Sequence, residues 1–184
     1  MNFLASTGQL RAGLIRSALI CVPLVLLLGT LSGTLSGTNA EGAWFAALEK
    51  PDAYPPPAAF GIVWGVLYAL MGMALALVIS AYGARGRGLA IIAFAVQLAV
   101  NLAWSPIFFG AHRMSWALVD ILLLDVAIVV TMVLFARVRP VAAWLLAPYL
   151  VWVLFASYLN WAILQKNPDL DGIQVPVAVQ RIEF

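Results

Sequence analysis

The chain has 184 residues, of which 64% are hydrophobic and only 10% are charged, and its formal net charge is +2. Soluble domains average about 45–50% apolar and about 25% charged residues, so this composition excludes an ordinary soluble fold. A single cysteine, Cys21, excludes a disulfide scaffold. The few basic residues form no run, which argues against nucleic acid as a partner. An integral membrane protein remains.

Five apolar stretches are each long enough to cross a bilayer, which takes roughly 20 residues. The predicted spans are residues 17–38, 59–82, 88–110, 114–136 and 140–164. The short links after the second, third and fourth spans force neighbouring helices to run antiparallel. The sequence therefore predicts an all-α, integral membrane five-helix transmembrane bundle. The expected organisation is an N-terminal extension (1–16), the membrane domain (17–166) and a flexible C-terminal tail (167–184).

The first span has two interpretations. Its apolar part is short, Arg11 and Arg16 precede it, and small residues follow it, as in a cleaved signal peptide. A mature chain starting near Glu41 would keep four spans. The alternative, which we prefer, is a retained helix whose small residues allow close packing.

Basic residues in the short loops predict the orientation. The N-terminal side carries six, and the opposite side carries four: Lys50, Arg113, Lys166 and Arg181. This bias predicts a multi-pass protein with its N-terminus inside and its C-terminus outside.

The loop of residues 39–58 is the longest internal connection. Its proline run, residues 55–57, cannot be helix interior, and its Trp44, Phe45 and Tyr54 are too apolar for a free tether. Two readings stay open: a segment lying on the lipid headgroups, or a lid folded over the mouth of the bundle.

Two faces of the third span differ in character. Gln97, Asn101, Trp104 and Phe108 fall within a narrow arc, and amides facing lipid are costly, so this arc should face the interior or a cavity. It serves either as a ligand-binding surface or only for hydrogen bonds between helices. The opposite face carries a ridge of small residues suited to close packing, inside the bundle or in a homodimer: Ala95, Ala99 and Ala103.

Aromatic residues recur on the other spans. Trp64 and Tyr68 share a face of the second span. On the fifth, one arc carries Tyr149, Trp152, Ala156 and Asn160. Rings and a few amides around a pocket suit a large, flat, mostly apolar ligand. The remaining tryptophans are assigned to interfacial belts: Trp44, Trp116, Trp144 and Trp161.

Ionisable residues inside the spans are few. Asp120 is interpreted as a structural acid in preference to a proton relay, and Asp125 has no assigned role. The single histidine, His112, excludes a two-histidine metal site, and no motif for a nucleophile or a phosphate loop is present. A metal-free tetrapyrrole, which needs no axial ligand, fits this residue set better than haem.

The run from Gln97 to Gly110, QLAVNLAWSPIFFG, closely resembles the TspO/MBR family, the tryptophan-rich sensory proteins. Supporting matches are WALVD at residues 116–120, VWGVLY at 63–68 and PYLVW at 148–152. The resemblance covers roughly residues 20–168. It implies five transmembrane helices, a homodimer, and a cavity closed by the first loop.

The resemblance also implies a function: binding of porphyrins, notably protoporphyrin IX, by a sensor, regulator or carrier with no required cofactor. Light-dependent porphyrin degradation is the enzymatic alternative, and by position Trp64 and Trp152 resemble the two tryptophans implicated in it. A third possible function, which does not depend on a ligand, is a membrane scaffold for partner proteins. One departure is that Ala53 and Ala58 stand where family members often have loop tryptophans, so we expect a less aromatic lid.

Overall fold

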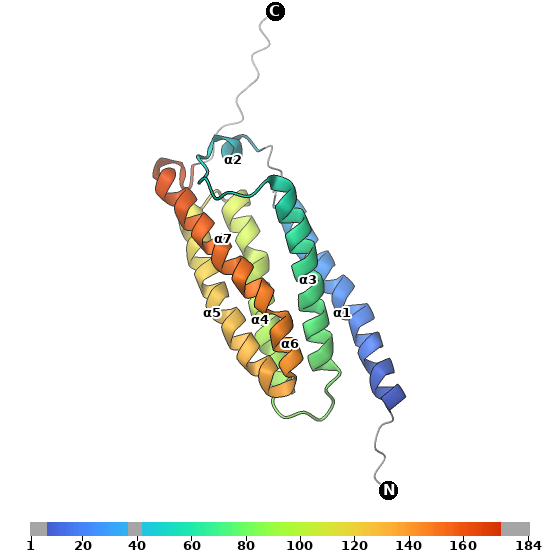
Figure 1. Cartoon of the computed structure of the whole chain (residues 1–184). Coiled ribbons are helices and arrows are strands. Elements are labelled where there is room, and N and C mark those ends of the chain that lie inside the picture. Colours follow the sequence, from blue (N-terminus) through green and yellow to red (C-terminus); the bar gives the residue numbers. More distant parts are fainter. Residues whose placement is uncertain (1–6, 37–41, 174–184) are drawn as a thin grey trace, which may run out of the picture.

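The computed structural model describes residues 7–36 and 42–173, and its elements there are all helical (Figure 1). In chain order they are α1 (Thr7–Leu35), α2 (Ala43–Ala47), α3 (Pro57–Ile79), α4 (Arg87–Ser105), the π-helix η1 (Pro106–Gly110), α5 (Met114–Val138), α6 (Pro140–Leu145), α7 (Ala147–Lys166) and the 3-10 helix η2 (Pro168–Leu170).

Five helical segments are long and apolar enough to cross a bilayer. The predicted all-α transmembrane bundle is therefore confirmed. The first helix differs from the prediction, because α1 begins at Thr7 and takes up most of the expected 1–16 extension. The second ends at Ile79, since a tight turn follows in which Gly83 and Gly86 both adopt positive φ.

The long helices pack side by side in the bundle. α1 runs along α3, α4 along α5, and α5 along α7, while α6 contacts α3 (Figure 1). The α1–α3 contact is close because Gly72 has no side chain: an added Cβ would lie 2.6 Å from the Cα of Val22. Such small residues allow helix backbones to approach in a membrane.

Pro106 ties α4 to α1. A proline has no N–H, so Pro106 cannot donate to the carbonyl of Leu102 four residues earlier. The Ser32 hydroxyl of α1 donates to that carbonyl instead, at 2.6 Å. The chain then continues as a π-turn, in which the Ala111 N–H donates to the Pro106 carbonyl at 2.8 Å.

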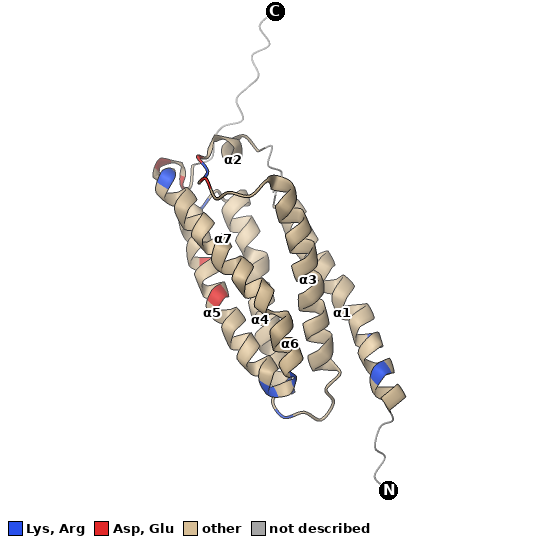
Figure 2. Cartoon of the chain, viewed as in Figure 1, with Lys and Arg blue, Asp and Glu red and all other residues tan. Residues whose placement is uncertain are grey.

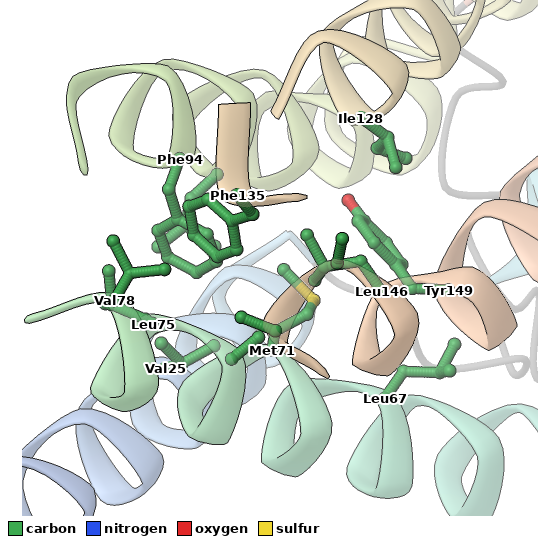
Figure 3. Packing of buried hydrophobic residues seen from close by; sticks show 14 of the residues in the cluster. Val25, Leu67, Met71, Leu75, Val78, Phe94, Ile128, Phe135, Leu146 and Tyr149 are labelled. Carbon is green, nitrogen blue, oxygen red and sulfur yellow. The ribbon is translucent and has the colours of Figure 1, made fainter. Parts of the chain in front are cut away.

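The hydrophobic core fills the half of the bundle away from α2. Phe94 and Phe135 stack with ring centroids 5.8 Å apart, and Met71, Leu146 and Tyr149 are fully buried beside them (Figure 3). In the half nearer α2, the inward-facing positions include glycines and aromatic rings that surround a cavity instead of filling it.

The loop containing α2 closes this hollow end of the bundle (Figure 1). Trp44, Phe45 and Leu48 are buried against Phe108 and Ile163. The described residues of the loop therefore fold over the end of the bundle, as the lid interpretation expects, and their contact with headgroups stays untested.

Residues 167–173 were expected to begin a flexible tail, and instead they pack on the lid. Asn167 is buried: its amide oxygen accepts from the Glu49 N–H at 2.8 Å, and its Nδ2 donates to the Glu49 carbonyl at 2.9 Å. The indole of Trp44 donates to the Leu170 carbonyl at 3.1 Å. The rest of the predicted tail lies outside the described residues.

Candidate ligand-binding site

A cavity of about 470 Å³ lies under the lid, between the ends of the five long helices. Its wall is dominated by aromatic rings from the lid loop and from four other elements: Phe45, Tyr54, Phe60, Trp64, Tyr68, Trp104, Phe108, Phe109 and Trp152.

Most of the predicted site residues meet at this cavity. Eight of the ten are part of its wall: Trp64, Tyr68, Asn101, Trp104, Phe108, Trp152, Ala156 and Asn160. The other two, Gln97 and Tyr149, lie one turn deeper in the core. Both are fully buried, and the Tyr149 hydroxyl donates to Gln97 Oε1 at 3.1 Å. The expectation that Gln97 and Asn101 face the interior is confirmed, but Gln97 is not on the wall.

The rings of the wall stack in pairs along their helices. On α3, Trp64 and Tyr68 lie 5.2 Å apart and nearly parallel, at 28°. On α4 and η1, Trp104 and Phe108 lie 4.9 Å apart at 20°. Stacking along one helix follows from the four-residue spacing, which puts both side chains on the same face.

Two pairs of polar side chains in the wall are joined by hydrogen bonds. The Tyr68 hydroxyl donates to Asn101 Oδ1 at 3.1 Å, and the Trp104 indole donates to Asn160 Oδ1 at 3.1 Å. Asn160 Nδ2 donates to the Met114 carbonyl at 3.0 Å. Both amide oxygens are thus already hydrogen-bonded. In the described part of the chain, the buried indole nitrogen of Trp152 has no hydrogen-bond partner.

The lid supplies wall residues that the helix patterns did not single out. Phe45 and Tyr54 lie in the loop, and Phe60 follows at the start of α3. Burial raises the pKa of the Tyr54 hydroxyl, which therefore stays neutral. Ala53 and Ala58 are exposed and are not part of the wall. The apolar loop composition was the available signal for these residues.

α1 contributes the small residues of the wall, which the sequence patterns also missed. Gly29 faces Tyr68 so closely that an added Cβ would lie 2.2 Å from its ring. Thr30 and Thr34 also border the cavity, and their hydroxyls donate to carbonyls of their own helix at 2.8 and 3.0 Å. Retention of this span stays a prediction, and a retained span would complete the wall on this side.

Three of the four tryptophans assigned to interfacial belts lie on the outer surface: Trp116, Trp144 and Trp161 are 65%, 75% and 50% exposed. The assignment of Trp44 is wrong. It is buried in the lid and stacks on His112, with ring centroids 4.4 Å apart. Its position in the loop, rather than at a span end, explains the difference.

The acids of α5 lie away from the cavity wall. Asp125 Oδ2 accepts from the Ser157 hydroxyl at 2.8 Å and so links α5 to α7, which gives this residue a structural contact. Asp120 Oδ2 is buried without a partner among the described residues. That part of the chain also holds no group of three metal-ligating side chains.

The fold and the cavity define a class of protein: a polytopic membrane bundle with an aromatic chamber under a loop lid. Residues 21–165 match the sequence profile of the TspO/MBR family. The tryptophan-rich protein TspO of Chlorobaculum tepidum is 44% identical over 151 residues, which is 81% of this chain and 94% of that protein. The human translocator protein is 44% identical over 138 residues, which is 73% of this chain and 81% of that protein. Protein CrtK of Rhodobacter capsulatus is 36% identical over 138 residues, which is 74% of this chain and 86% of that protein. The chain belongs to the TspO/MBR family.

Proposed function

We propose that this protein binds a flat, mostly apolar ligand of the tetrapyrrole type, such as protoporphyrin IX, as a membrane sensor, regulator or carrier. The observation that carries the proposal is the aromatic cavity whose amide oxygens are hydrogen-bonded internally. Its volume lies within the range of about 300–1,000 Å³ that is usual for ligand pockets. Planar rings favour a planar ligand that stacks on them.

The polar groups favour a particular pose. Since the oxygens of Asn101 and Asn160 are occupied, the ligand body would meet rings rather than amides. The unpaired indole nitrogen of Trp152 suits a hydrogen-bond acceptor on the ligand. Lys50 is not on the wall, but its ammonium lies 4.6 Å from the centroid of the Phe45 ring. It donates to the carbonyls of Phe45 and Leu48, and its third hydrogen would be left for an acidic substituent at the lid.

A titration of tryptophan fluorescence with protoporphyrin IX in the dark tests this proposal. The wild type should show saturable quenching, and the Trp64→Leu/Trp152→Leu variant should lose it. The matched control is Trp116→Leu/Trp144→Leu, which removes two exposed indoles and should keep it. Equal, non-saturable quenching in all three proteins would mean that porphyrin only partitions into the detergent micelle.

Light-dependent degradation of the bound porphyrin is the second candidate. It is favoured by Trp64 and Trp152 both lying on the cavity wall, where an indole can exchange an electron with an excited macrocycle. Illumination of the saturated complex should then bleach the porphyrin band and produce a new product band. If free porphyrin in detergent bleaches at the same rate, the protein does not catalyse the degradation, and only the binding proposal stands.

A homodimer through α4 is also proposed. Ala95 and Ala99 are exposed on the outer surface and Ala103 is half-buried, so the ridge does not pack inside the bundle. Small residues exposed to lipid allow a second helix to approach closely. Ala99→Leu should raise the monomer fraction in light scattering, whereas Ala136→Leu, at an exposed position of α5, should not. An unchanged dimer in Ala99→Leu would exclude this interface, and co-purification of a different stoichiometric partner would favour a scaffold.

The N-terminus is proposed to lie inside, because the arginines of the α3–α4 loop and the α5–α6 turn lie at the end of the bundle where α1 begins (Figure 2). In a Cys21→Ala background, a cysteine at Gly83 should be labelled only from the inside and a cysteine at Asp52 only from the outside. The reverse pattern would contradict the proposed orientation.

A further inference from the structure

The end of the bundle where α1 begins is purely basic in the described part of the chain (Figure 2). It carries six arginines: Arg11, Arg16, Arg85, Arg87, Arg137 and Arg139. The acidic residues that the structure describes lie in α5, in the lid loop and after α7: Glu49, Asp52, Asp120, Asp125, Asp169 and Asp171. The ion pair found among the described residues joins Lys166 to Glu49, at the opposite end. Within residues 7–36 and 42–173, no carboxylate therefore neutralises this basic end.

A groove opens at the same end, between the first turns of α1 and the last turn of α3. It is lined by Gln9, Leu10, Gly13, Ser80 and Tyr82. On both α1 and α3, the groove and the ligand cavity lie at opposite ends of the helix, and the two share no lining residue. The groove is therefore independent of the function proposed above.

Tyr82 lines this groove, and Arg87 lies outside it against the Tyr82 ring. The Tyr82 ring is 70% exposed, and the Arg87 guanidinium lies 5.1 Å from its centroid. Tyrosine is typical of the headgroup level of a bilayer, and its ring holds a cation in place. Further along α1, toward the membrane, Leu19 and Ile20 are 70% and 66% exposed. A mostly apolar groove, with Arg87 against one of its lining rings, thus continues into an apolar helix face.

We infer that this basic end binds an anionic phospholipid, with the headgroup on the arginines beside the groove. The phosphate would lie against Arg87 and Arg85, because a guanidinium pairs with phosphate oxygens through two parallel hydrogen bonds. The acyl chains would follow the exposed apolar face of α1. A zwitterionic headgroup fits less well, since the described residues of this end offer its ammonium no carboxylate.

Native mass spectrometry of the delipidated protein in a nonionic detergent tests the inference. The probes are phosphatidylglycerol and phosphatidylcholine with identical acyl chains, at equal concentrations. The wild type should retain phosphatidylglycerol selectively. Arg85→Gln/Arg87→Gln should bind it about tenfold more weakly, since each basic residue contributes to the attraction. Arg113→Gln/Lys166→Gln removes two positive charges at the opposite end and should bind as the wild type does.

A third variant, Arg137→Gln/Arg139→Gln, removes two charges from the basic end but leaves the groove intact. It should lose less affinity than Arg85→Gln/Arg87→Gln, and a melting curve of each variant confirms that it is folded. Equal retention of both lipids by the wild type, or equal losses in all three variants, would overturn the site, because either result would show an effect of net charge alone.

Discussion

The closest approach of α1 to the cavity wall, at Gly29, gives the sharpest test of the structure. Replacing Gly29 by alanine would put a Cβ 2.2 Å from Cε2 of Tyr68, far inside van der Waals contact. The ring is also held by its hydrogen bond to Asn101 and by its stacking on Trp64. Gly29→Ala must therefore move the ring, move α1, or both.

The cost can be worked from these contacts. Overpacking a filled site costs about 1–3 kcal/mol, and losing the hydrogen bond from Tyr68 to Asn101 adds about 0.5–1.5 kcal/mol. Alanine recovers up to about 1 kcal/mol because it is the better helix former. The net destabilisation should be about 1–3 kcal/mol. The displaced ring should also weaken porphyrin binding.

Thermal unfolding in detergent and the dark porphyrin titration measure both effects. The matched control is Gly13→Ala on the same helix, where the added Cβ would lie at an ordinary 3.8 Å from Tyr82. That variant should be neutral or slightly more stable than the wild type. If Gly29→Ala and Gly13→Ala melt alike and bind porphyrin alike, the close approach of α1 to Tyr68 is refuted.

Two further substitutions test the contacts that hold the cavity together. Asn167→Ala removes the side chain whose amide bonds both backbone groups of Glu49, so it should cost about 1–3 kcal/mol and speed hydrogen exchange in the lid loop. Lys166→Gln breaks only an exposed ion pair and should change stability much less, and equal effects of the two variants would contradict this assignment. Ser32→Ala leaves the Leu102 carbonyl unpaired and should lower the melting temperature, whereas Ser32→Thr, which keeps the hydroxyl, should restore most of it.

The sequence was sufficient for the fold because each span carries its own signal. A run of about 20 apolar residues must be helical in a bilayer, where every backbone group needs a partner. The start of α1 was misplaced for the same reason: Arg11 and Arg16 are exposed beyond the apolar run, and hydropathy does not register a helix that extends past the membrane.

The site was predictable where helical spacing alone determines the facing direction. Asn101, Trp104 and Phe108 were assigned to one face, and the structure places them on one wall. Depth was not predictable, because spacing says which way a side chain points but not how far along the helix the cavity extends. Gln97 and Tyr149 share these faces and bond each other below the cavity floor.

Contacts between segments distant in sequence were outside the reach of any local pattern. The lid is held by Asn167, which lies more than a hundred residues after it, and by the Leu170 carbonyl. Phe45 and Tyr54 belong to the wall only because those contacts fold the loop over the bundle.

The cavity itself results from where the sequence places its small residues. Met71, Phe94 and Phe135 fill the core half of the bundle, whereas the facing positions of the other half include Gly61 and Gly65. A Cβ added to either glycine would meet no atom within 4 Å. The absent side chains at these two positions therefore contribute to the space of the cavity, while α1 and α3 stay in close contact at Gly72.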